Sequence, residues 1–100
     1  MYFSDEIILI SNEYKKDSIN QQIPQETTKK VFCDIEGVSS KEMFEAGRNG
    51  LRPECRVIVF KSDYNGETIV ELGELRYGVY RTYPKNNETI ELYLERKAGV

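Results

Sequence analysis

The sequence contains no histidine and no tryptophan, and it has only two cysteines and three prolines. Without histidine there is no Ser-His-Asp triad, no Cys-His pair and no zinc-protease helix. Most enzyme classes also lose their usual proton shuttle. The carboxylate pairs Asp34 with Glu36 and Glu91 with Glu95 each fall on one predicted strand face, which is typical of a solvated surface. We therefore expect no catalytic residue, no enzymatic activity, and no metal or cofactor.

The two cysteines, Cys33 and Cys55, are too few to form a four-ligand zinc site. The 21 residues between them fit no Cys-x-x-Cys redox motif. Both lie within short apolar runs, which predicts reduced thiols in or beside the core, with a disulfide as the alternative. Synthesis in a cytoplasm favours the reduced form.

Long apolar runs are also missing, since no run exceeds four residues, as at Ile7 to Ile10. A membrane helix needs roughly 20 such residues. The first six residues include the acidic pair Asp5-Glu6, where a signal peptide would carry positive charge. Its net charge is −3, so no bulk attraction to DNA or to an anionic membrane is expected. These features predict a protein that is made in a cytoplasm and has no membrane partner.

A chain of 100 residues corresponds to one domain, which we expect to span residues 1–100. Apolar and β-branched residues alternate with polar ones between turn signals, which predicts strands. In the last strand, for example, Ile90, Leu92 and Leu94 face inward. The predicted strands cover residues 6–11, 27–37, 54–62, 67–72, 75–83 and 89–97. Residues 12–26 are polar and contain a proline, so they predict a loop that pairs loosely as an edge segment.

The turn signals between the later strands predict a regular meander. Asn65-Gly66 is the dipeptide expected in a tight hairpin, and Gly73 marks the next turn. Five or six short antiparallel strands can bury one face by curling into a small barrel, which also hides their edges. The expected fold class is therefore all-β, a small antiparallel barrel with one long loop that carries a short helix.

That long loop covers residues 39–53, an unusual length for a connection in so small a domain. Ser39 or Ser40 can cap a helix over residues 41–46, and Gly47 offers a left-handed stop. One interpretation is a solvated connector. The other is an assembly loop whose exposed apolar residues contact a neighbour and whose basic residues meet phosphate. The residues concerned are Lys41, Met43, Phe44, Arg48 and Arg52.

The strand at 75–83 concentrates tyrosine and arginine. Three interpretations remain open: cross-strand packing, a protein interface, and stacking of single-stranded bases as in OB folds. The candidate interface residues are Tyr77, Tyr80, Arg81 and Tyr83.

The order of several motifs resembles the small head-closure, or head-tail joining, proteins of tailed bacteriophages, which include the head-completion stopper proteins. The likeness covers roughly residues 27–100. It rests on Val38 to Gly47, Gly50-Leu51-Arg52-Pro53-Glu54, Asp63 to Glu67, the strand Tyr77-Gly78-Val79-Tyr80-Arg81-Thr82-Tyr83, and Ile90 to Lys97.

The resemblance implies a β-barrel subunit of the virion neck, synthesised in the cytoplasm of a bacterial host. Such subunits form a homo-oligomeric ring, twelvefold in this expectation, and can be monomeric when isolated. The implied partners are a portal or adaptor protein above, a tail-completion protein below, and double-stranded DNA in the channel. The family's long loop projects toward that channel and corresponds here to residues 39–53. Because this loop varies widely in the family, retention of DNA by the loop is a further hypothesis.

Two functions therefore follow from the sequence. The first is a non-enzymatic connector subunit of a phage or prophage that joins the DNA-filled head to the tail. The alternative is an OB-like module that binds single-stranded nucleic acid through the strand at 75–83.

Overall fold

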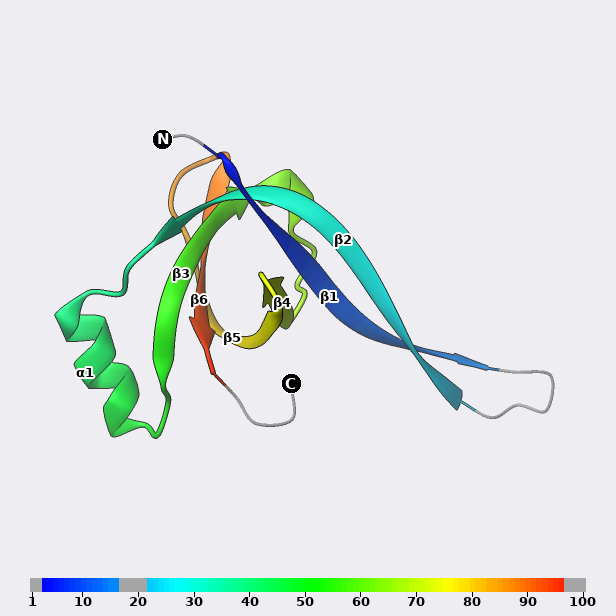
Figure 1. The fold of residues 1–100 in the computed structure, drawn as a ribbon, viewed down its shortest axis with the longest axis horizontal. Helices are drawn as coiled ribbons and strands as arrows, with labels where there is room; N and C mark the ends of the chain where they lie inside the picture. Colours follow the sequence, from blue (N-terminus) through cyan, green and yellow to red (C-terminus); the bar gives the residue numbers. More distant parts are fainter. Residues whose placement is uncertain (1–2, 17–21, 97–100) are drawn as a thin grey trace.

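The computed structural model describes residues 3–16 and 22–96, and it shows a closed antiparallel barrel with one short α-helix (Figure 1). The all-β barrel predicted from the sequence is confirmed. The elements in chain order are β1 (Asp5–Lys16), β2 (Gln22–Glu36), α1 (Ser40–Arg48), β3 (Pro53–Phe60), the 3-10 helix η1 (Lys61–Asp63), β4 (Ile69–Leu72), β5 (Leu75–Pro84) and β6 (Thr89–Glu95).

The barrel interior is filled by alternate residues of every strand, as the period of two requires. Burying each aliphatic side chain of this size contributes roughly 1.5–3 kcal/mol. The alternation predicted around Cys33 and Leu92 is confirmed, and both side chains are fully buried. The core cluster consists of Ile7, Leu9, Val31, Cys33, Val57, Val59, Val70, Tyr77, Leu92 and Leu94.

The strand order around the barrel is β1-β2-β3-β6-β5-β4, with β4 returning to β1. The predicted meander is therefore wrong at one point, because β3 does not pair with β4. Both edges of β3 are already occupied, by β2 and by β6, so the chain must cross the end of the barrel before β4 begins. Asn65-Gly66 lies in this crossing and not in a hairpin, although Gly66 has the positive φ of 83° that a tight turn favours.

Hydrogen bonds at both ends of the crossing fix its path and move two predicted strand boundaries. The amide of Lys61 donates to the carbonyl of Glu88 at 2.8 Å, and the Tyr64 hydroxyl donates to the carbonyl of Glu67 at 2.8 Å. The strand predicted at 54–62 consequently ends at Phe60, and the one predicted at 67–72 begins at Ile69. The last predicted strand ends at Glu95, and residue 97 lies outside the described residues.

Residues 12–26, predicted as a loop that pairs loosely as an edge segment, do pair, but as regular strands for most of their length. β1 continues to Lys16 and β2 begins at Gln22, and the two strands pair without a register break. We call residues 11–16 and 22–27 the ribbon, because beyond Ile10 they extend past the barrel as two strands alone (Figure 1). Residues 25–28 are all exposed, so neither face needs apolar residues and no alternation marks the strand. Residues 17–21 lie outside the described residues.

The cysteines are free, with Cys33 buried in the core and Cys55 half-buried on β3. The structure therefore agrees with the predicted reduced thiols and shows no disulfide between Cys33 and Cys55.

Candidate functional site

The segment between β2 and β3, residues 37–52, carries α1 on the outside of the barrel, beside β3 and on the opposite side from the ribbon (Figure 1). We call it the helical segment. Of the two serines predicted as caps, Ser39 is the N-cap, and its Oγ accepts a hydrogen bond from the amide of Glu42 at 3.2 Å. The predicted stop at Gly47 is wrong, because the helix continues to Arg48 and the positive φ of 79° falls on Gly50.

The apolar contact between α1 and the barrel is small. Ala46 is the one buried residue of the helix. An open cleft of about 280 Å³ separates the helix from β5, and Glu42, Leu51, Tyr80 and Arg81 are among the residues that line it. The helix therefore needs polar contacts to hold its position.

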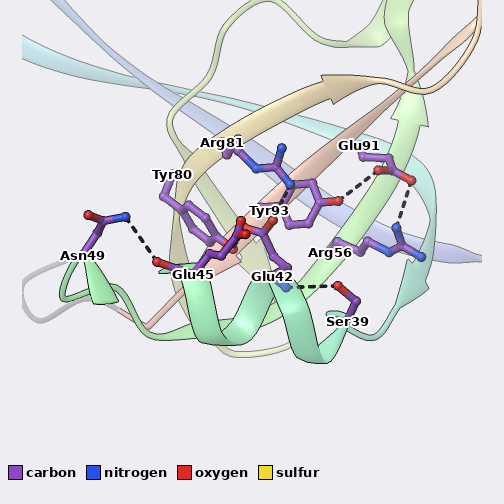
Figure 2. A network of polar contacts seen from close by, with 9 residues as sticks. All are labelled: Ser39, Glu42, Glu45, Asn49, Arg56, Tyr80, Arg81, Glu91 and Tyr93. Atoms are coloured by element: carbon purple, nitrogen blue, oxygen red, sulfur yellow. Dashed lines mark hydrogen bonds and ion pairs between the residues drawn. The ribbon is translucent and has the colours of Figure 1, made fainter. Parts of the chain in front are cut away.

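Glu42 supplies those contacts (Figure 2). Its Oε2 accepts a hydrogen bond from the Tyr80 hydroxyl at 2.9 Å, and its Oε1 is ion-paired with the Arg81 guanidinium. The carboxylate side chain is only 15% exposed, so this pair is less screened than a surface ion pair. Burial, followed by the hydrogen bond to Glu42, raises the pKa of Tyr80 above its ordinary value, so the hydroxyl stays a donor.

A β-bulge explains how two consecutive residues reach the same carboxylate. In the pairing of β5 with β6, Val79 lies opposite Leu94 and Arg81 lies opposite Tyr93, which leaves Tyr80 as the extra residue. Regular alternation would send Tyr80 and Arg81 to opposite faces of the sheet. The bulge re-aims the strand, so that both side chains lie on the outer face under α1.

The network continues from Arg81 across the outer face of β6. The Arg81 guanidinium carbon lies 4.1 Å from the centre of the Tyr93 ring, within the range of a cation–π contact. The Tyr93 hydroxyl donates to Glu91 Oε1 at 3.2 Å. Both Tyr93 and Glu91 are buried although they face away from the barrel interior, because the outer side chains cover them. The prediction that Glu91 lies on a solvated strand surface is therefore wrong.

Arg56 of β3 completes the network. It contacts Glu91 Oε2 at 3.2 Å and Glu36 Oε2 at 2.9 Å. Burial by itself would lower the pKa of Arg56, but the contacts with Tyr93, Glu91 and Glu36 outweigh it, and the net pKa is raised. The guanidinium therefore stays charged between two carboxylates and links β2, β3 and β6.

The five residues predicted for an assembly loop are all exposed. Met43 is 44% exposed and Phe44 is 68% exposed, which are high values for apolar side chains. Lys41, Arg48 and Arg52 are exposed as well. The Arg48 guanidinium carbon lies 6.0 Å from the Phe44 ring centre, so one face of the helix combines apolar and basic groups.

The four residues predicted as an interface on β5 do not form one surface. Tyr77 points into the barrel core, so its prediction as an interface residue is wrong. Tyr80 is half-buried, and both Tyr80 and Arg81 contact Glu42. Of the four residues, Tyr83 is the one aromatic side chain that is largely exposed, at 55%. For Tyr77 and Tyr80, the packing interpretation of this strand is the one that the structure supports.

Sequence reasoning missed the carboxylates and the arginine that organise this site. The pattern Ser39-x-x-Glu42 is a capping-box signature and marks Glu42 as special. It does not indicate that the carboxylate turns to the barrel instead of back to the helix cap. For Arg56, Glu91 and Tyr93 no local signal exists, because their contacts join positions far apart in the chain.

In the described part of the chain, no three His, Cys, Asp or Glu residues are grouped as a metal site would require. No described helix has the length and apolar character needed to span a membrane. No protein-family model matches the chain, and no curated protein is significantly similar to it.

Proposed function

We propose that this protein is a non-enzymatic subunit of a phage head-tail connector, a head-closure protein that acts through the helical segment. The observation that carries the proposal is the exposed face of α1. A nine-residue helix that presents Met43 and Phe44 to solvent, next to three basic residues, is built to contact something outside its own barrel.

The way the segment is attached supports this role. A turn of a few residues can join neighbouring strands, and this connection is much longer. The core cluster of the barrel contains no residue of the helix, and Ala46 is the one residue of α1 that is buried. A segment that adds little to the core but is held by Glu42, Tyr80 and Arg81 is positioned for another purpose.

In a ring of such subunits, the apolar pair Met43 and Phe44 would contact a neighbouring copy or the adaptor. Lys41, Arg48 and Arg52 would face DNA phosphates in the channel. Symmetry would multiply each weak contact, so the chain's net charge of −3 does not oppose a local basic ring. The alternative of a single-strand binder gains no support, because Tyr77, Tyr80 and Arg81 are already occupied.

The test is to replace residues 39–52, which leaves β3 intact, by a short Gly-Ser linker in the phage or prophage that encodes the chain. We expect the barrel to fold, since loop closure changes slowly with loop length. We also expect heads that leak DNA or do not join tails. Normal infectious particles from the shortened protein would overturn the proposal.

Two smaller variants separate the contacts. Met43→Ser with Phe44→Ser should prevent incorporation of the subunit into particles. Lys41→Gln, Arg48→Gln and Arg52→Gln together should permit incorporation but weaken DNA retention. Glu45→Gln, an exposed change on the same helix, is the matched control and should behave as wild type. Tight binding of a single-stranded oligonucleotide by the isolated protein at physiological salt would favour the alternative function instead.

A further inference from the structure

One edge of β2 is open over much of its length. β1 pairs with β2 over twelve consecutive residues, but β3 pairs with it only from Asp34 to Glu36. Between residues 25 and 33, no described strand occupies the other edge. Backbone N–H and C=O groups on such an edge are free to pair with another strand.

The features that commonly prevent a strand edge from pairing with another chain are weak at this edge of β2. A bulge would twist the edge away, but the β1–β2 register is continuous. Lysines repel an incoming strand, but Lys29 donates to the carbonyl of Asp63 at 2.9 Å and Lys30 is ion-paired with Glu6 at 3.2 Å. A two-stranded ribbon is marginal in water by itself, so an added strand would stabilise it.

The charges along this edge are arranged symmetrically about Thr28. Glu26 and Lys30 lie two residues to either side of it and, by alternation, on the same face. In an antiparallel pair of identical strands with Thr28 opposite Thr28, each Glu26 lies opposite a Lys30. Opposite charges and threonine pairs at directly facing positions both stabilise a sheet. The edge is therefore complementary to a second copy of itself.

We propose that β2 of one copy pairs antiparallel with β2 of a second copy, around a twofold axis at Thr28. The existing ion pairs agree with this arrangement. Within one copy, Arg76 donates two hydrogen bonds to Glu26, at 3.0 and 2.8 Å, and Lys30 is ion-paired with Glu6. Across the axis the charges would therefore alternate in a row, which runs from Glu6 and Lys30 of one copy to Glu26 and Arg76 of the other. Phe32, 56% exposed on the same face, adds apolar area at each end of the contact.

The pairing is closed, because it uses the same edge of both copies and leaves none for a third. It goes beyond the proposed connector function, since it uses β2 and not the helical segment. A failure of either proposal therefore leaves the other standing.

The test uses the purified full-length chain in sedimentation velocity over a wide concentration range. We expect the wild type to form a dimer. Glu26→Lys alone and Lys30→Glu alone each place like charges across the axis twice, which should raise the dimer dissociation constant about tenfold or more. The double variant should restore association between copies, although both ion pairs within one copy stay broken.

Two controls make the result specific. Lys61→Glu, the same charge change on the exposed η1, should leave the dimer unchanged. Thr28→Cys should form a disulfide-linked dimer under mild oxidation, whereas Thr27→Cys, on the opposite face and off the axis, should not. A wild type that stays monomeric at every concentration, or a double variant without restored association, would overturn the proposal. So would equal cross-linking of the two cysteine variants.

Discussion

Glu42 of α1 and Arg81 of β5 form an ion pair across 39 positions of sequence, and the adjacent Tyr80 donates to the same carboxylate. The contact depends on the bulge at Tyr80, which puts consecutive side chains on one face. Because Ala46 is the single buried residue of the helix, this polar contact is the main attachment of the helical segment to the barrel.

Glu42→Ala should loosen the helical segment without unfolding the barrel. The change removes one ion pair and one hydrogen bond, so we expect the free energy of unfolding to fall by about 1–2 kcal/mol. We also expect faster tryptic cleavage after Lys41 and Arg48. Urea unfolding and mass spectrometry of limited digests measure the two effects.

Glu45→Ala is the matched control, since Glu45 is exposed on the same helix. Its effect on unfolding should stay within about 0.5 kcal/mol, with wild-type cleavage rates. Equal behaviour of the two variants would show that the contact with Arg81 does not hold the helix.

Arg56→Met should be among the most damaging single substitutions on the outer face. It leaves the Glu91 side chain, 8% exposed, without its cation, and breaking a buried pair from one side costs about 3–5 kcal/mol. Adding Glu91→Gln should recover part of that loss, because the buried charge is then gone. Chemical denaturation of the two variants checks this, and a double variant less stable than the single one would contradict it.

The Cys33 thiol should be unreactive in the folded protein. Burial, with smaller contributions from Asp5 and Asp34, raises its pKa from 9.0 to about 12. At pH 8 a thiol reagent should therefore label it only after denaturation, whereas the half-buried Cys55 should react sooner. Rapid labelling of Cys33 in native buffer would contradict this.

The same shift sets the direction of an alkaline effect on stability. Above a pKa of 9.0 the unfolded chain releases the Cys33 proton, while the folded chain keeps it up to about pH 12. The stability contributed by the neutral thiol is thus complete below pH 9 and is lost as the pH rises toward 12. Cys33→Ala should lower stability at neutral pH and flatten this alkaline decline.

The contact between Glu26 and Arg76 should weaken in acid. The hydrogen bonds from Arg76, the largest cause, lower the pKa of this carboxyl below 4.5. The contact therefore stabilises the fold above pH 4.5 and is lost as the pH falls through the lowered pKa. An NMR titration of Glu26 should show the shift, and Arg76→Gln should remove it. An ordinary pKa in the wild type would refute the contact in solution.

Many of the strands of the barrel could be predicted from the local alternation of apolar and polar residues. The alternation around Val31, Cys33 and Ile35 and again at Ile90, Leu92 and Leu94 identifies strands and their inner faces, because side chains on a strand alternate whatever the strand pairs with. Ser39 as a helix cap is equally local, since its partner is three residues away.

Which strands pair, and which face of the sheet a side chain occupies, depend in contrast on residues distant in the chain. Asn65-Gly66 reads as a hairpin, but β3 has no free edge to offer β4 once β2 and β6 are in place. Tyr80 and Arg81 are consecutive in one tyrosine-rich strand, and only the bulge brings both side chains to Glu42 on the same face. A register shift of one residue reverses which face a side chain occupies, and the shift after Val79 exists only in the pairing of β5 with β6.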